Sequence, residues 1–248
     1  MIVFGERSNG ERTRFARNLD GDVFHRSDWM NSGQDETLSP NMFLVEQPAH
    51  AVLRPHFHRQ NQYQLFVDGS GTIGRTTLRP YTVHYAGAFT GYGPVIAGAE
   101  GLKYFTFRPV YEIGLIPAED REQMVRGPKR HETVGPIDLA TPADNARPCD
   151  EALLETPSRD LAVRRIRMAP AQSLSPRPAP ASQGAVFFVL QGMVRTAGKS
   201  LERWESVFVS SDDTWPMLTA GPEGAEALLL CVPPRAPEYR GARAPAAQ

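Results

Sequence analysis

The feature that most constrains the fold of this chain is an internal repeat. Three pairs of short segments align at one offset of 123 positions (177 − 54 = 123): RPHFH at 54–58 with RPAPA at 177–181, FVDG at 66–69 with VLQG at 189–192, and AGAEG at 97–101 with AGPEG at 220–224. Separate matches at one offset, without a gap between them, indicate a duplicated structural unit. The chain is therefore expected to contain two similar units, one near 41–111 and one near 164–234.

The apolar runs in both units are short and bounded by turn residues. Runs such as LKYFTF, FVLQG, SVFVS and ALLLCV are rich in β-branched or aromatic residues, and the chain contains 22 prolines and 21 glycines. Many short strands separated by turns are typical of sandwiches and barrels, so the predicted fold class is all-β. One short helix is expected at 118–126 (AEDREQMVR), between Pro117 and Gly127.

The remaining residues are expected to flank and connect the two units. Residues 1–40 form an N-terminal segment in this interpretation, and residues 112–163 form a Pro-rich linker that contains the short helix. Residues 235–248 (RAPEYRGARAPAAQ) show no apolar periodicity, which predicts a flexible tail.

The composition is that of an ordinary soluble globular protein, with 41% apolar and 22% charged residues. A net charge of −1 provides no basic footprint, so no nucleic-acid partner is expected. No run approaches the ~20 apolar residues that cross a bilayer, and the first residues lack the apolar stretch of a secretory signal. The short apolar runs give no reason to expect a membrane partner. Because there are only two cysteines, without CxxC spacing, we expect the protein in a reducing cytoplasm.

Two histidines one residue apart are the strongest candidates for a chemical site. Side chains alternate between the two faces of a strand, so His56 and His58 would project together and could converge on one cation. On the strand expected next, Gln62, Gln64 and Phe66 would share one face and line an interior.

The opposite face of that next strand carries Tyr63, Leu65 and Val67, and it is too apolar to face water. We expect this face to be buried against the other unit, the N-terminal segment or a second subunit. A homodimer is therefore one expectation.

The segment H56-F-H58-x3-Q62-x6-G69 resembles the first motif of the cupin superfamily, G-x5-H-x-H-x3–4-E-x6-G. Two positions depart from the motif, because His50 stands at the leading glycine and Gln62 at the glutamate. The second cupin motif is matched only by turn glycines in residues 87–98 (GAFTGYGPVIAG), without its metal-binding histidine. Together with the repeat, the chain resembles a bicupin, which implies two jelly-roll β-barrels in one chain.

The resemblance implies one divalent transition metal (Fe, Mn, Ni or Zn) in the first barrel. The candidate ligands are His56, His58, Gln62 and His84. Gln62 is neutral and a poorer ligand than the carboxylate of the motif, and His84 is equally compatible with a packed core histidine. At the three motif positions of the second unit the repeat places only alanine, so no metal is expected there: Ala179, Ala181 and Ala185.

The same interior is expected to bind a small organic molecule. The candidate substrate-binding residues are Gln64, Phe66, Tyr92 and Tyr104. The resemblance favours a metal-dependent enzyme acting on a small, for example aromatic, molecule. Its chemistry would be dioxygenase-like with iron and isomerase-like or hydrolase-like with zinc. The alternative is a non-catalytic binding or sensing bicupin with a vestigial metal site, which the missing glutamate and the missing histidine support.

Overall fold

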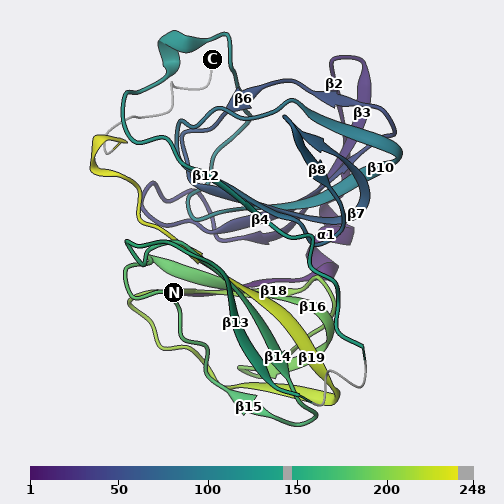
Figure 1. Cartoon of the computed structure of the whole chain (residues 1–248), viewed down its shortest axis with the longest axis vertical. Helices are drawn as coiled ribbons and strands as arrows, with labels where there is room; N and C mark the ends of the chain where they lie inside the picture. Colours follow the sequence, from purple (N-terminus) through teal and green to yellow (C-terminus); the bar gives the residue numbers. More distant parts are fainter. Residues whose placement is uncertain (142–146, 240–248) are drawn as a thin grey trace. The chain divides into compact units, whose positions relative to one another are not determined.

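The structure is a computed structural model, and it describes residues 1–141 and 147–239 (Figure 1). These residues form two compact units. The first barrel comprises residues 12–137 and 235–239, and the second barrel comprises residues 1–11 and 138–234. Residues 240–248 of the expected tail lie outside the described part. Within that part, no helix has the length and apolar character needed to span a membrane.

Nine strands of the described residues form the main sheet of the first barrel: β2 (Phe15–Leu19), β3 (Asp22–Asn31), β4 (Asn41–Gln47), β5 (Val52–Leu53), β7 (Gln62–Ile73), β8 (Thr76–Leu78), β9 (Val83–Ala86), β10 (Val95–Arg108) and β12 (His131–Val134). Their order is β12-β9-β7-β10-β4-β3-β2, with β5 beside β10 and β8 beside β7. A second, two-stranded sheet pairs β6 (His56–Phe57) with β11 (Ile116–Pro117), and this pairing fixes the backbone at the first candidate ligand.

Eight strands of the described residues form the sheet of the second barrel: β1 (Ile2–Gly5), β13 (Cys149–Glu155), β14 (Ala162–Met168), β15 (Ser173–Leu174), β16 (Gly184–Thr196), β17 (Lys199–Leu201), β18 (Ser206–Ser210) and β19 (Leu218–Val232). Their order is β1-β18-β16-β19-β14-β13, with β15 beside β19 and β17 beside β16. The predicted all-β class with two barrels is thus confirmed.

The duplication is visible in the strand register. Gly69 on β7 lies opposite Leu102 on β10, and Gly192 on β16 lies opposite Ala225 on β19, so both members shift by 123 (192 − 69 and 225 − 102). The two glycines also share a positive φ, +75° and +76°, at which a Cβ would collide with a backbone carbonyl of the neighbouring strand. The predicted equivalence of the two units is therefore confirmed at a position that only glycine fits.

The offset changes ahead of these strands. The pairing of Leu102 with Gln47 corresponds to that of Ala225 with Met168, so β4 and β14 are 121 residues apart (168 − 47). Two additional residues therefore enter the second unit between β15 and β16. They lengthen the loop that, in the first unit, carries the histidine pair.

The N-terminal segment and the linker expected from the sequence are built into the two sheets. Strand β1 pairs with β18, while β2 and β3 extend the first sheet beyond β4. In the linker, β12 pairs with β9 and β13 pairs with β14. The signal for β2 and β3 was Asp20-Gly21, the turn between them, where both residues have positive φ.

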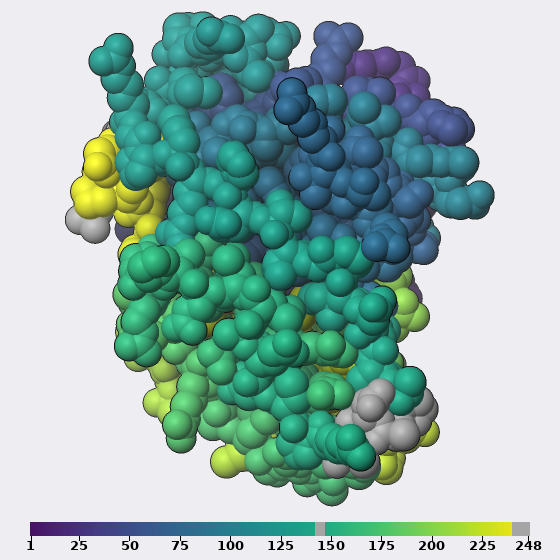
Figure 2. Space-filling model, viewed as in Figure 1, coloured from purple at the N-terminus to yellow at the C-terminus, as the bar shows by residue number. Residues whose placement is uncertain are grey.

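The helical structure also differs from the expectation at 118–126. Only one 3₁₀ turn, η1 (Arg121–Gln123), occurs in this stretch, because its few apolar side chains give a helix no face to bury. A short helix α1 (Arg7–Thr13) and a 3₁₀ turn η2 (Pro237–Tyr239) lie near the chain ends. Tyr239 is buried and donates a hydrogen bond to the Pro128 carbonyl at 2.7 Å, and in Figure 2 the yellow end of the chain lies against teal surface.

The two interiors are filled differently. The apolar face of β7 is buried as expected, with Tyr63 packed edge-on against Tyr85 at 5.2 Å between ring centroids. The interior of the second barrel is a closed hydrophobic cluster that includes Phe187, Val207 and Cys231. The interior of the first barrel contains, beside an apolar cluster that includes Phe66 and Tyr104, a group of buried polar side chains, and these form the candidate site.

Candidate functional site

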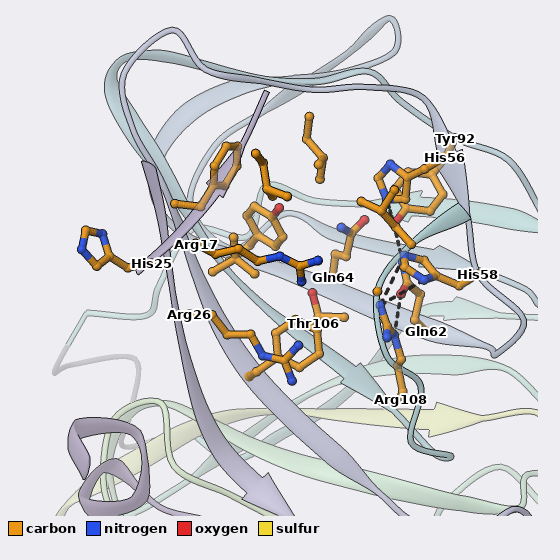
Figure 3. A pocket seen from close by; sticks show the side chains of 18 residues that line it. Arg17, His25, Arg26, His56, His58, Gln62, Gln64, Tyr92, Thr106 and Arg108 are labelled. Atoms are coloured by element: carbon orange, nitrogen blue, oxygen red, sulfur yellow. Dashed lines mark hydrogen bonds between the residues drawn. The ribbon is translucent and has the colours of Figure 1, made fainter. Parts of the chain in front are cut away.

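One pocket of the first barrel gathers the polar side chains of its interior (Figure 3). Strand β7 contributes Gln62 and Gln64, which are two residues apart and so face the same side. Strand β10 contributes Tyr104, Thr106 and Arg108 by the same alternation. All five side chains are almost fully buried, so each polar group needs a partner from the protein or from a ligand.

The two histidines and Tyr92 close one end of this pocket (Figure 3). His56 lies on β6 and His58 directly follows that strand, so the short β6–β11 pairing holds both. Tyr92 is placed by a backbone bridge to His56, in which each residue donates its N–H to the carbonyl of the other. The ring centroids of His56 and His58 are 5.1 Å apart.

A directional chain of hydrogen bonds connects these side chains. Nδ1 of His56 lies 2.7 Å from the Arg54 carbonyl oxygen, which only accepts, so Nδ1 carries the proton. Nε2 of His56 therefore accepts from the Tyr92 hydroxyl at 2.8 Å. That hydroxyl oxygen accepts from Nε2 of Gln62 at 2.5 Å, and Oε1 of Gln62 accepts from Nε of Arg108 at 3.0 Å.

This chain explains the glutamine at the position where the cupin motif has glutamate. The residue at 62 accepts a hydrogen bond from a guanidinium and donates one to a phenol oxygen, which an amide does and an ionised carboxylate does not. A carboxylate would accept from both neighbours, which would turn the Tyr92 proton away from His56. We call the four side chains of Arg108, Gln62, Tyr92 and His56 the arginine–histidine chain.

Arg108 is the centre of charge at this end of the pocket. Besides Gln62, its guanidinium donates to the Glu112 carbonyl oxygen at 2.9 Å and lies 3.2 Å from the ring nitrogens of His58. The Glu112 carboxylate accepts from the backbone N–H of Arg59 and is 3.8 Å from Nδ1 of His58. One buried carboxylate thus accompanies one buried guanidinium, which limits the cost of burying both charges.

Burial keeps the histidines of the site uncharged at neutral pH. It lowers the pKa of His56 to about 4 and the pKa of His84 to about 4. Burial, reinforced by the Arg108 charge, holds the pKa of His58 well below its usual value. Burial also raises the pKa of the Tyr92 hydroxyl, so the hydroxyl remains a proton donor.

His84 is buried nearby on β9 but does not line the pocket. Its Nδ1 lies 2.8 Å from the Thr133 hydroxyl on β12, and its ring centroid is 5.5 Å from that of Tyr92. Its Nε2 is buried and has no hydrogen-bond partner in the part of the chain that the structure describes. On the adjacent strand position, the Oε1 atom of Gln64 is also buried without a partner, so two polar atoms in this region lack a protein partner.

The arrangement of these residues does not fit a bound metal ion. The Nε2 lone pair of His56 is used by Tyr92, both ends of the Gln62 amide are used, and a guanidinium lies against His58. A dication ~4 Å from a guanidinium would be repelled by ~8 kcal/mol at an effective dielectric constant of ~20. Among the described residues, no group of three His, Cys, Asp or Glu side chains is arranged to hold a metal.

The structure places most of the predicted site residues together. Seven of the eight named from the sequence are in or beside the pocket region: His56, His58, Gln62, His84, Gln64, Tyr92 and Tyr104. Phe66 is instead part of a hydrophobic cluster, with its ring 5.2 Å from that of Tyr104. It pairs with Tyr104 across β7 and β10 and lies on the same face, but it belongs to the apolar cluster beside the pocket and not to the pocket lining.

The sequence analysis missed the arginines of the pocket. Arg108 could have been found from the alternation of Tyr104, Thr106 and Arg108 along an apolar strand, which places a charge on an inward face. Arg17 and Arg26 lie on the hairpin of β2 and β3, whose turn signal was the Asp20-Gly21 pair. His25, on the same hairpin, also borders the pocket but points away from it in Figure 3.

No family model matches the chain, and no curated protein matches it. Solved structures do match. The crystal structure of YhhW from Escherichia coli has a TM-score of 0.55 at 14% identity, covering 94% of this chain and 98% of that one. A crystal structure of the bacterial pirin YhhW in complex with nickel(II), also from Escherichia coli, has a TM-score of 0.56 at 13% identity and coverages of 94% and 100%. HEPD from Streptomyces albus, with 2-hydroxyethylphosphonate and Fe(II) bound, has a TM-score of 0.58 at 11% identity and coverages of 99% and 79%.

A cupin 2 conserved barrel domain protein from Leptotrichia buccalis has a TM-score of 0.50 at 15% identity, covering 90% of this chain and 94% of that one. Likeness at these identities establishes the fold. The chain has the fold of the bicupins, which confirms the resemblance inferred from the His-x-His segment and the repeat.

Proposed function

We propose that this chain is a bicupin that binds a small organic molecule in the pocket of its first barrel, and that side chains hold this molecule without a metal ion. The observation that carries the proposal is the arginine–histidine chain, which uses the lone pairs that a cupin metal would need. Arg108 supplies a fixed positive charge at the place where a metal would supply one.

The second barrel supports this assignment by contrast. Among its described residues, the positions that match the polar ones of the first pocket carry apolar side chains of one buried cluster, such as Phe187 and Cys231. One site per chain, in the first barrel, is therefore the proposed stoichiometry. A cytoplasmic location and a homodimer remain predictions, the second of which light scattering of the purified chain would test.

The test is a metal titration of the wild-type chain and of His56→Ala. Each protein, freed of metal by dialysis, is titrated with Ni(II), Mn(II), Zn(II) and, without oxygen, Fe(II). We expect no uptake by wild type beyond that of His56→Ala, because Tyr92 and Arg108 occupy the ligands. Uptake of one equivalent by wild type, lost in His56→Ala and in His58→Ala, would contradict the proposal.

The second candidate function is a metal-dependent, dioxygenase-like bicupin enzyme with one Fe, Mn, Ni or Zn ion in the first barrel. It is supported by the His-x-His pair, by the unpartnered Nε2 of His84, and by the fold shared with proteins that contain nickel(II) or Fe(II). Its donors would be His56, His58 and His84, with Gln62 beside them. Stoichiometric uptake that is lost in His84→Ala would favour this function and make His84 a ligand.

A further inference from the structure

The charges that line the pocket are all of one sign. Arg17, Arg26 and Arg108 line it, and none of the lining residues within 1–141 and 147–239 is an aspartate or a glutamate. Two of these arginines have carboxylates close behind them. Arg26 pairs with Asp28 at 2.9 Å, and Arg108 lies near Glu112. Their charges are therefore partly balanced by the protein itself.

Arg17 is different because it has no such carboxylate. Among the described residues, it forms no ion pair, and it is exposed on β2. In Figure 3 its guanidinium extends across the pocket toward Gln64 and Thr106. An arginine that points into a pocket without a counter-charge is a ready partner for a carboxylate, which its planar fork binds with two hydrogen bonds.

The walls near Arg17 are apolar. Leu19 and Phe24 come from the same hairpin, Phe43 lies on β4, and Leu53 lies on β5. Arg26 is stacked over the Phe43 ring at 3.8 Å, which keeps the ring against the pocket. A ligand that satisfied Arg17 would therefore place an apolar body between these side chains.

Deeper in the pocket, the ligand would meet an unpartnered acceptor. Oε1 of Gln64 is buried and has no hydrogen-bond partner among the described residues, and Gln64 lines the pocket and is 2% exposed. A buried acceptor without a partner is unfavourable, and a ligand hydroxyl or amine would supply the missing hydrogen bond by donating to it.

We propose that the ligand of the first barrel is a small organic carboxylate with an apolar body and a hydrogen-bond donor at the far end. Arg17 binds the carboxylate, Phe24 and Phe43 contact the body, and Gln64 accepts from the donor. This inference rests on the proposed function and adds to it the chemical class of the ligand.

The experiment compares three one-ring probes by calorimetric titration of the full chain. 4-Hydroxyphenylacetate carries the charge, the ring and the donor. 4-Hydroxyphenylacetamide lacks only the charge, and phenylacetate lacks only the donor. We expect the hydroxylated acid to bind about tenfold more tightly than either of the others, since one charge-assisted contact or one satisfied buried acceptor is worth about 1.4 kcal/mol.

Two variants assign the contacts. Arg17→Gln should weaken the two acids about tenfold and leave the amide unchanged, whereas Gln64→Leu should remove the advantage of the hydroxylated acid over phenylacetate. Arg75→Gln, an exposed arginine in the turn between β7 and β8, is the matched control and should change nothing. A neutral probe that binds as tightly as its acid, an Arg17→Gln variant with wild-type affinities, or no binding of any probe would overturn the inference.

The outcomes also separate this inference from the proposed function. Metal uptake in the titration above would defeat the metal-free site whatever the probes do. An amide that binds as well as the acid, in a chain that takes up no metal, would leave the proposed function intact and defeat only the carboxylate.

Discussion

The two barrels place different chemistry at matched positions of the same strands. Gln64 pairs with His84 across β7 and β9, and the equivalent pair in the second barrel is Phe187 with Val207, 123 residues later. Arg108, at the end of β10, corresponds to Cys231 at the end of β19. A strand framework fixed by a few glycines and paired edges therefore accepts either a polar or an apolar interior.

The difference shows which residues the fold needs and which it does not. Gly69 and Gly192 have the same positive φ in both barrels, and at each of them a carbonyl oxygen of the neighbouring strand is too close to leave room for a Cβ. The inward positions of β7, β9 and β10 carry no such requirement, since the second barrel fills them with apolar side chains. The polar set of the first barrel is therefore not required by the strand framework that the two barrels share.

The largest loss of stability is expected when the second barrel receives the glutamine that the first barrel has at the matched position. Phe187→Gln would remove a fully buried ring and bury an amide without partners, which costs about 5 kcal/mol. The reverse exchange, Gln64→Phe, should cost less than about 1 kcal/mol because the pocket has space and Oε1 of Gln64 has no partner to lose.

Tryptophan fluorescence during urea unfolding distinguishes the barrels, since Trp29 lies in the first and Trp204 and Trp215 in the second. The Trp204→Phe/Trp215→Phe background reports the first barrel, and Trp29→Phe reports the second. If Phe187→Gln and Gln64→Phe lower the free energy of unfolding of their barrels by the same amount, the proposed difference between the barrels is wrong.

Acid should also act on one barrel only. All six histidines of the sequence lie between positions 25 and 131, within the first barrel. The folded pKa values of His56 and His84 are about 4, below the unfolded value of ~6.5. The unfolded state therefore binds more protons in this window, and stability falls as the pH drops from ~6.5 toward ~4.

The free energy of unfolding of the first barrel should be lower at pH 5 than at pH 7, by about 2 kcal/mol for each of these two histidines. The second barrel has no histidine and should lose none by this route. The two tryptophan backgrounds, unfolded in urea at pH 5 and pH 7, measure both values. Equal acid sensitivity of the barrels would show that the histidines are not the buried, neutral groups described here.

The architecture could be predicted from the sequence further than the site could. The repeat and the His-x-His segment were sufficient for two barrels, because a constant offset and a two-residue spacing survive substitution elsewhere. The contributions of β1, β2 and β3 were missed, since pairing between distant segments leaves little local pattern. Only the Asp20-Gly21 turn marked the hairpin.

At the site, the sequence predicted which residues gather but not how they are bonded. His56, His58 and Gln62 could be grouped from spacing alone. The role of Gln62 depends on Arg108 and Tyr92, which are 46 and 30 positions away, and no spacing rule predicts that an amide will bridge them. In the structure, Tyr92 is hydrogen-bonded to His56 and Arg108 lies against His58, which are two of the ligands expected for the metal.

A smaller effect is expected where the barrels differ by one charge. Arg108→Met would leave Gln62, His58 and the Glu112 carbonyl without their donor, at a cost of about 3 kcal/mol to the first barrel. The matched change, Cys231→Met, enlarges an apolar side chain and displaces the weak sulfur acceptor of the Ala179 N–H, and it should cost about 1–2 kcal/mol. Urea unfolding in the two tryptophan backgrounds measures both, and similar costs would mean that Arg108 is not bonded as described.

The smallest effect on stability is expected from restoring the carboxylate of the cupin motif. In Gln62→Glu the new carboxylate would pair with Arg108, while the Tyr92 hydroxyl would turn to it and leave Nε2 of His56 without a donor. One charge-assisted hydrogen bond is gained and one neutral hydrogen bond is lost, so the free energy of unfolding should change by no more than about 1 kcal/mol.

Metal affinity is the sharper measurement for this variant. Gln62→Glu alone should take up no Ni(II), because the guanidinium still neutralises the carboxylate, whereas Gln62→Glu with Arg108→Met should bind it through His56, His58 and the carboxylate. Uptake by the single variant would mean that the glutamine, and not the arginine, keeps metal out of the first barrel.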